Sequence, residues 1–299
     1  MNVIWSGSGN YASPALLAHP DHLRADQYED ADMSLPTVAM FWDGPPLSFI
    51  ERLCTKSFVD AGHKVVLFSY GKVEGVPDGV EMAPASDILP HPDTMLRHDR
   101  TGSPAPYSDK FRYHLLARHD GLIWSDTDAY CLKPFEPKDG YFFGRETDDV
   151  VANGVLALPA ASPTLKALID MCEDEYTIPV WMRRAQVREI KARHDAGDPM
   201  HVSEMPWGVW GPRALSHFLK ENDEFRHALE PHVLYPVGFA DRRLYFRRAA
   251  LTWNMVRDDT VSIHFYGRRC RQLLKIKYDG VPPPTSVLGE LATRHGLAA

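Results

Sequence analysis

Two aspartates, Asp126 and Asp128, follow an apolar segment in the stretch "GLIWSDTDAYCLKPF" (121–135) and are separated by a single threonine. Two carboxylates this close repel each other unless a positive charge lies between them. Hard divalent cations such as Mg²⁺ or Mn²⁺ prefer carboxylate oxygen and complete their coordination with phosphate oxygens. The pair therefore indicates a site for a divalent cation and a diphosphate. The alternative is that both side chains only cap a turn, since an Asp-X-Asp pattern by itself is common.

The neighbouring elements predict which side chains lie beside this pair. Residues 107–121 have the pattern of a helix with Ser108 as its N-cap, and residues 122–126 that of a buried strand. A tight turn makes the two antiparallel, and both are roughly 17 Å long. The start of the helix, with Asp109 and Arg112, should therefore lie beside the two aspartates. Ligands of open α/β sheets bind at this end of the strands.

Strands and helices alternate along the chain. Residues 37–44, 46–62 and 64–70 have the patterns of a strand, a helix and a strand, which predicts a parallel, right-handed βαβ unit. Later segments continue the alternation, with helices expected at 162–176, where Ser162 can be the N-cap, and at 211–222, and a strand at 260–267. This order predicts an α/β fold.

The composition is that of a soluble protein of one large domain or two small ones. The chain has 299 residues, 44% of them hydrophobic and 24% charged, and its formal net charge of −7 does not favour nucleic-acid binding. Its four cysteines form no CxxC pair, which is typical of a reducing compartment. No signal peptide or membrane-spanning run is evident, so we expect a cytoplasmic protein, free or in peripheral contact with the inner face of a membrane.

The segment "SDKFRYHLLARHDGLIWSDTDAYCLKPF" (108–135) resembles the signature of the DXD sugar-transfer family. This family includes bacterial capsular and lipopolysaccharide glycosyltransferases, related to α-1,4-galactosyl- and α-1,6-mannosyltransferases. Residues 40–71 resemble its opening βαβ unit, and a weaker likeness in "NGVLALPAASP", "WGPRALSHFL" and "IHFYG" extends it over most of 37–267. The chain departs from the family at Asp120, where many relatives have a second glycine in the turn.

The resemblance implies a GT-A-like fold, with a central, mostly parallel sheet flanked by helices. We expect a single domain over 1–299, with the nucleotide-sugar-binding part at about 37–160 and the acceptor side at about 161–299. It also implies a nucleotide-sugar donor, with a UDP-sugar favoured over GDP-mannose, and a divalent cation, Mn²⁺ or Mg²⁺. The acceptor would be a glycan or a lipid-linked molecule, and transfer would retain the anomeric configuration.

Individual residues match the family's site. Asp128 would be the direct metal ligand, and Asp126 would lie nearer the ribose or sugar, partly through the metal. Arg112 completes the predicted catalytic group. The residues that would bind the donor or complete the metal site are Asp109 and Arg112 at the sugar and ribose, Asn153 with Gly154 in a polar turn, Trp42 in the donor site, and His264 as a further metal ligand.

Residue alternation adds to the prediction for His264. In "VSIHFYG" (261–267), Ile263 and Phe265 fall on one face of the expected strand, and His264 and Tyr266 fall on the other. A histidine that faces away from the apolar side can be a ligand, or it can be a half-buried residue held by hydrogen bonds.

Three other features of the sequence each allow a functional and a structural interpretation. Arg268 and Arg269 could contact the diphosphate or form a solvated turn. Trp207 and Trp210 could stack on a sugar or base, or pack in the core. The basic segment 180–197 could bind an anionic membrane or the acceptor, or be a solvated helix face.

Two other functions compete with sugar transfer. A phosphatase of the haloacid-dehalogenase type also has Asp-X-Asp after a strand, but it requires Thr or Val where this chain has Tyr130. A nucleotide-sugar-binding module without catalysis is the other alternative. The sequence predicts neither the donor sugar, the acceptor, a catalytic nucleophile nor the oligomeric state.

Overall fold

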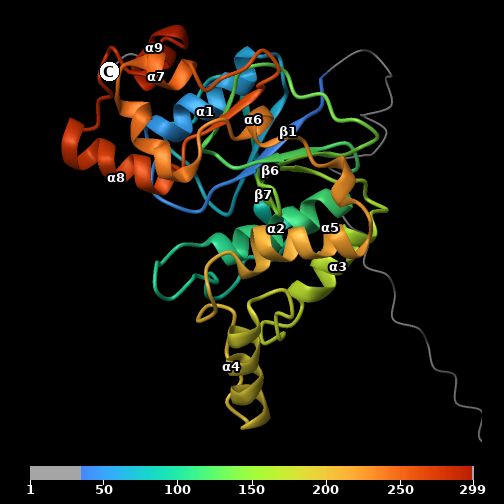
Figure 1. Ribbon diagram of the computed structural model, residues 1–299. Coiled ribbons are helices and arrows are strands. Elements are labelled where there is room, and N and C mark those ends of the chain that lie inside the picture. The colour runs from blue at the N-terminus through green and yellow to red at the C-terminus, as the bar shows by residue number, and fades with distance from the viewer. Residues whose placement is uncertain (1–34, 298–299) are drawn as a thin grey trace, which may run out of the picture. The chain divides into compact units, whose positions relative to one another are not determined.

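A six-stranded sheet lies at the centre of the computed structural model, which describes residues 35–297 (Figure 1). The strand order is β3-β2-β1-β4-β7-β6, in which β3, β2, β1 and β4 are parallel, β7 is antiparallel to β4, and β6 is antiparallel to β7. The strands are β1 (Val38–Phe41), β2 (Val65–Ser69), β3 (Val80–Pro84), β4 (Ile123–Ser125), β6 (Phe142–Thr147) and β7 (Val150–Ala157). This confirms the predicted α/β class and is consistent with a GT-A-like arrangement.

The first βαβ unit is formed as predicted. Strand β1 pairs in parallel with β2, and α1 (Phe49–Asp60) connects them. Both strands are short runs of Val, Leu, Phe and Met, the composition of parallel strands that are covered on both faces. The helix begins at Phe49 rather than at residue 46, because Ser48 is its N-cap and donates its backbone N–H to Glu51 at 2.9 Å.

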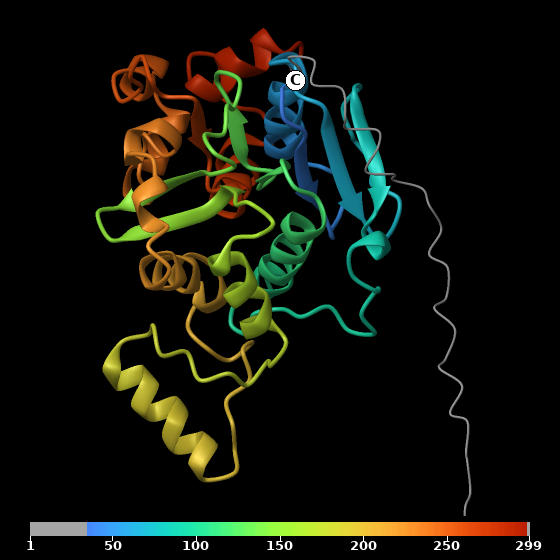
Figure 2. The same cartoon turned by 90° about the vertical axis from the view of Figure 1, so that its right-hand side faces the viewer.

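Helices cover both faces of the sheet (Figures 1 and 2). On one face lie α2 (Ala105–Arg118), α3 (Pro163–Cys172) and α5 (Ala214–Glu221). Phe41, Phe111, Trp124 and Leu215 belong to the core on that side. The other side carries α1, α6 (Pro231–Leu234), α7 (Ala249–Trp253), α8 (Gly267–Tyr278) and α9 (Val287–Arg294).

The late strand predicted at 260–267 forms, but outside the central sheet. It is β8 (Ser262–His264), which pairs antiparallel with β5 (Ala129–Cys131) in a two-stranded sheet. The register places Ala129 opposite His264. Residues that are far apart in the sequence, the second aspartate and the late histidine, are therefore neighbours.

Besides that of α1, two predicted helix starts are wrong. Helix α2 begins at Ala105, so Ser108 lies in its first turn, where its N–H bonds to the Pro104 carbonyl at 2.9 Å, and it is not the N-cap. Helix α5 begins at Ala214, after an irregular wide turn, η3 (Val209–Arg213), because Gly211 is non-helical, with φ −88° and ψ −118°. The cap of α3 is confirmed, since Ser162 Oγ accepts a hydrogen bond from the Leu165 N–H at 3.1 Å.

The remaining elements lie mostly in the connections. They are α4 (Arg184–Asp195) and the short 3₁₀ turns η2 (Ala85–Asp87), η4 (Phe225–His227) and η5 (Phe239–Phe246). Helix α4, expected within 180–197, projects away from the sheet (Figures 1 and 2). Within residues 35–297, no helix is both long and apolar enough to cross a bilayer.

The described residues, 35–297, belong to one compact unit. Residues 1–34, which the sequence prediction included in the same domain, lie outside the described part of the chain. The division of the domain near residue 160 stays a prediction.

Candidate active site

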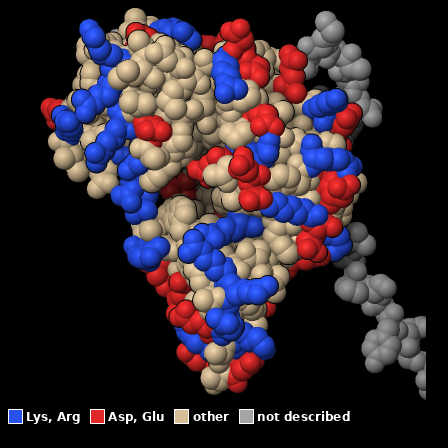
Figure 3. All heavy atoms as spheres, viewed as in Figure 1, with Lys and Arg blue, Asp and Glu red and all other residues tan. Residues whose placement is uncertain are grey.

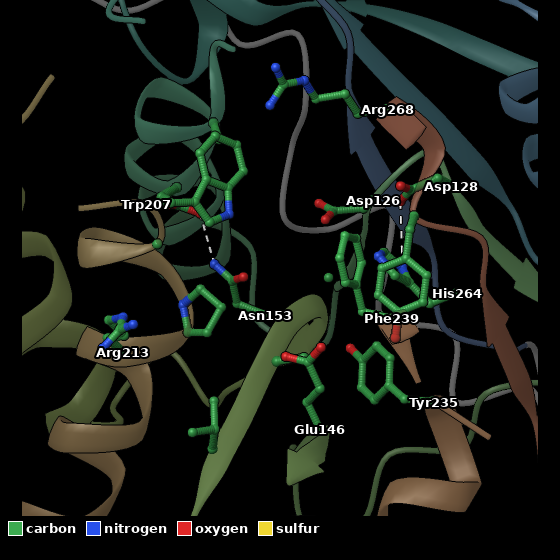
Figure 4. Close-up of a pocket in the computed structure, with 18 of the residues that line it drawn as sticks. Asp126, Asp128, Glu146, Asn153, Trp207, Arg213, Tyr235, Phe239, His264 and Arg268 are labelled. Carbon is green, nitrogen blue, oxygen red and sulfur yellow. Dashed lines mark hydrogen bonds and ion pairs between the residues drawn. The ribbon is translucent and has the colours of Figure 1, made fainter. Parts of the chain in front are cut away.

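A pocket of about 970 Å³ opens beyond the carboxyl end of β4. Asp126, the first residue after that strand, lies on its wall with Asp128 (Figure 4). The pocket brings together most of the residues predicted from the sequence, which are Asp109, Arg112, Asp126, Asp128, Asn153, Gly154 and His264. The predicted packing of the start of α2 against the end of β4 is therefore confirmed.

One wall of the pocket is a buried network around Arg112, whose side chain is only 4% exposed. Its guanidinium pairs with Asp109 Oδ1 at 3.1 Å and with Asp126 Oδ1 at 3.3 Å, and it also donates to the Asn153 carbonyl. It lies 4.6 Å from the centre of the Trp124 ring. These contacts satisfy a buried cation with two carboxylates, as a charge in this environment requires.

Asparagine and tryptophan side chains complete the network. Asn153 Nδ2 donates to Asp109 Oδ1 at 2.7 Å, and Trp124 Nε1 donates to Asp126 Oδ1 at 2.9 Å. We call Asp109, Arg112, Asn153 and Asp126 the buried network. The three Arg112 nitrogens, Asn153 Nδ2 and one oxygen of each aspartate have partners within the protein, so the positions of these side chains are set before any ligand binds.

The network shifts the pKa of its charged members. Burial raises the pKa of Asp109 to about 6, although Arg112 and the hydrogen bond from Asn153 oppose the shift. Burial also raises the pKa of Asp126, again against Arg112, and the nearby charge of Asp128 adds to the increase. For Arg112, burial acts to lower the pKa, but the two carboxylates outweigh it and the pKa is raised.

Beside the buried network lies an open pair, Asp128 and His264 (Figure 4). Asp128 Oδ2 accepts a hydrogen bond from the Gly267 N–H at 2.5 Å, at the start of α8. Its other oxygen, Oδ1, lies 3.5 Å from His264 Nδ1, which is too far for a hydrogen bond. His264 Nδ1 is buried and has no hydrogen-bond partner among the described residues. A buried polar atom without a partner is costly, so this nitrogen is available for a ligand.

Two glycines allow these side chains to approach the backbone. A Cβ at Gly154 would lie 3.2 Å from Asp126 Oδ2 and 3.3 Å from His264 Cε1. A Cβ at Gly267 would lie 2.8 Å from the Cβ of Asp128. Each glycine therefore leaves room for an acidic side chain that a larger residue would displace.

A third glycine packs closely against the buried network. A Cβ at Gly211 would lie 2.9 Å from Asp109 Oδ2 and 3.0 Å from Asn153 Nδ2. The same turn is held by the Tyr113 hydroxyl, which donates to the Trp210 carbonyl at 2.8 Å. The irregular backbone that delays the start of α5 is thus the backbone that packs on the site.

The residues of the open pair fit a divalent cation. A carboxylate oxygen and an imidazole nitrogen are ligands that Mn²⁺ accepts, and the unpartnered Nδ1 faces the carboxylate. Among residues 35–297, no set of three or more His, Cys, Asp and Glu side chains is arranged to hold a metal by itself. A cation at the open pair would thus depend on oxygens of a bound ligand, as is usual for Mg²⁺ with phosphates.

Several pocket residues were not predicted from the sequence. They are Glu146 in the β6–β7 hairpin, Tyr235, Phe239, Arg100 and Arg213. Figure 4 shows the Glu146 carboxylate and the Tyr235 ring pointing into the pocket near His264. The hairpin sequence "RETDDV" has the pattern of a solvated turn, so no signal in it marks Glu146.

Of the remaining residues predicted from the sequence, some line the pocket and others do not. Trp42 does not line the pocket, because its indole N–H donates to the Pro45 carbonyl at 2.8 Å and its ring lies 5.8 Å from the Arg271 guanidinium. Trp207 lines the pocket and is 44% exposed, whereas Trp210 is buried. Arg268 and Arg269 both line the pocket, as the diphosphate hypothesis requires.

Comparison with known proteins gives little direct evidence. No protein-family profile matches the chain, and no curated protein matches it. Among solved structures, the chain is similar to "PaToxG Glycosyltransferase", with 12% sequence identity, coverage of 89% of each chain and a TM-score of 0.40. The function must therefore be argued from the pocket itself.

Proposed function

We propose that this protein is a metal-dependent glycosyltransferase that moves a sugar from a nucleotide-sugar donor to a hydroxyl group of a glycan or another acceptor. The observation that carries the proposal is the open pair: an aspartate oxygen and an unpartnered buried imidazole nitrogen, 3.5 Å apart, beside a second aspartate. The resemblance of residues 108–135 to the DXD family supports the same chemistry.

Different residues of the pocket would bind the metal, the diphosphate and the sugar. Asp128 and His264 would hold Mn²⁺ or Mg²⁺, which would neutralise charge on the departing diphosphate. Arg268 and Arg269, which line the pocket at the start of α8, would bind the phosphate oxygens. Asp109, Arg112 and Asn153 would orient the donor sugar and ribose, because their mutual contacts already fix their positions. Retention of configuration and a UDP-sugar donor remain part of the proposal on the resemblance alone.

A direct test measures release of nucleoside diphosphate from a panel of UDP- and GDP-sugars with Mn²⁺ and with EDTA. We expect slow metal-dependent release of UDP or GDP from at least one donor, through transfer to water. Release of inorganic phosphate instead would indicate a phosphatase, and donor binding without release would indicate a binding module. Calorimetry with UDP adds a second readout: equal affinity in Mn²⁺ and in EDTA would contradict metal-dependent binding.

A further inference from the structure

The C-terminal third of the chain carries a strong local excess of positive charge. Residues 239–280 contain ten Lys and Arg against four Asp and Glu, although the whole chain has 33 basic and 40 acidic residues. Within the described structure, only Arg271 of these ten forms a salt bridge, to the buried Glu51. The other nine cations have no carboxylate within salt-bridge distance among residues 35–297, so their charge is available to an external anion.

Helix α8 presents this charge together with an exposed apolar side chain. From Gly267 to Tyr278 it has five Lys and Arg and no acidic residue. Arg268, Gln272, Lys275 and Ile276 recur at helical spacing and are exposed, whereas Cys270 and Leu274 are buried on the opposite side. Ile276 is 76% exposed, the highest value among the exposed large hydrophobic residues of the described chain.

The turn η5 lies alongside α8 and extends the surface. Phe239, at the start of η5, contacts Tyr266 edge-on at 5.3 Å, and Phe246, at its end, stacks on Tyr278 at 5.2 Å. The exposed arginines of this segment, Arg243, Arg247 and Arg248, lie in and just after η5. We call α8 with residues 239–248 the basic face. Figure 3 shows Lys and Arg side chains gathered on the side of the molecule where α8 lies in Figure 1.

We propose that the basic face docks on an anionic lipid surface. Unpaired Lys and Arg are attracted to the negative potential of such a surface, and an apolar side chain that projects between them can enter the boundary between headgroups and acyl chains. The exposed Ile276 distinguishes this surface from one that only binds a soluble polyanion. Four of the eight exposed large hydrophobic residues in the described chain lie within residues 239–281: Phe239, Leu251, Ile276 and Val281.

The other basic helix, α4, has these properties to a lesser degree, since only Arg184 and Arg188 of its Lys and Arg form no salt bridge among the described residues. On α4, Lys191 pairs with Asp195 at 3.1 Å and Arg193 pairs with Glu204 at 3.0 Å. Its apolar Ile190 is buried, and no large hydrophobic residue of α4 is exposed. The membrane alternative considered for residues 180–197 therefore fits α8 better than α4.

Docking through the basic face would bring the pocket close to the lipid. Arg268, Arg269 and Phe239 belong both to the basic face and to the pocket wall. If the proposed glycosyl transfer is correct, an acceptor anchored in the membrane could reach the open pair without leaving the surface. This consequence rests on the proposed function, but the docking itself does not.

Co-sedimentation with lipid vesicles tests the docking without any activity assay. We expect the protein to bind vesicles of phosphatidylglycerol and phosphatidylcholine in equal parts, to bind pure phosphatidylcholine at least about tenfold more weakly, and to lose binding as salt is raised from about 0.05 M to about 0.5 M. Equal binding to both vesicles, or no binding to the anionic ones, would overturn the proposal.

Matched variants locate the surface. The double variant Lys275→Glu/Lys277→Glu should weaken anionic-vesicle binding at least about tenfold. The neutral change Ile276→Ser should weaken it by about tenfold, by a factor that changes little with salt. Neither change touches a pocket-lining residue, and Ile276 is too exposed for its loss to unfold the chain. The control Arg184→Glu/Arg188→Glu makes the same change of charge on α4 and should bind as wild type. A larger loss in the α4 variant than in the α8 variants would reject the basic face.

The two experiments can contradict the docking proposal and the proposed function independently. A protein that binds vesicles but releases no nucleotide would keep the docking surface and lose the proposed function. A protein that releases nucleotide but does not bind anionic vesicles would support the proposed function and contradict the docking surface.

Discussion

Two adjacent parts of the pocket, the buried network and the open pair, differ in how their polar atoms are paired. In the buried network, Arg112 contacts two carboxylates and a carbonyl, and Asn153 bonds to Asp109. In the open pair, Asp128 uses one oxygen to accept from Gly267, and the buried Nδ1 of His264 has no hydrogen-bond partner in the described chain. Mutual contacts hold the buried network in place before a ligand arrives, although no hydrogen bond within the described chain reaches Asp109 Oδ2, Asp126 Oδ2 or Asn153 Oδ1. The open pair instead has a buried nitrogen, His264 Nδ1, without any hydrogen-bond partner in the described chain. Substitutions in the buried network should therefore lower both stability and activity, whereas substitutions in the open pair should lower activity alone.

The largest effect is expected from Asp128→Asn. An amide oxygen keeps the hydrogen bond from Gly267 but removes the negative charge that a divalent cation needs, so nucleotide release should disappear at every Mn²⁺ concentration. The melting temperature should stay close to that of wild type. The measurement is nucleotide release against Mn²⁺, together with a thermal melt. Activity within about tenfold of wild type would remove Asp128 from the metal site.

The next largest effect, on stability, is expected from Arg112→Ala. Its loss leaves Asp109, which is 6% exposed, without its cation, so we expect destabilisation of about 3 kcal/mol as well as a loss of transfer. The sequence pattern predicts Arg112 as a catalytic and donor-binding residue and assigns it no role in stability. Denaturant unfolding measures the difference.

Arg112→Lys is the matched control for that prediction. It keeps the charge but loses the planar fork that contacts both carboxylates, so it should be destabilised less and still transfer poorly. An Arg112→Ala protein as stable as wild type would show that the buried network does not support the fold.

His264→Ala should have a smaller, recoverable effect. It removes a neutral ligand that water can partly replace, so activity should fall about tenfold to a hundredfold and return in part with more Mn²⁺. Metals that favour imidazole should lose their advantage in this variant. The readout is the metal dependence of nucleotide release in wild type and variant. A wild-type metal curve would show that the imidazole is a buried structural group and not a ligand.

The smallest effect is a pH dependence in the buried network. The pKa of Asp109 is raised from 3.8 to about 6 by burial, so between these values the folded state binds more protons than the unfolded state. Its contribution to the free energy of unfolding is greatest below pH 4 and is lost as the pH rises through about 6, by about 3 kcal/mol in total, of which about 2 kcal/mol falls above pH 4.5.

Asp109→Asn removes this titration. The stability of wild type relative to the variant should therefore decrease from about pH 4.5 to about pH 7.5 and then stay level. Chemical denaturation of both proteins at several pH values measures the difference. A constant difference across this range would mean that Asp109 is ionised in the fold at its ordinary pKa.

The sequence by itself determined the local elements and the acidic end of the site. The apolar runs at 38–41, 65–69 and 123–125 form parallel strands because each is too apolar to face water. The short turn after α2 makes the helix antiparallel to β4, which brings Asp109 and Arg112 to Asp126. These relations are short in sequence, so spacing alone predicts them.

Only the tertiary structure decided the rest of the pocket. His264 meets Asp128 because β8 pairs with β5, and Gly211 packs on Asp109 because an irregular turn replaces the expected start of α5. Glu146 and Phe239 come from a hairpin and a 3₁₀ turn whose sequences carry no periodic signal. Contacts between segments more than a hundred residues apart depend on how whole layers pack, and local propensity does not specify that packing. The same packing sets η5 beside α8, where separate basic segments become one face.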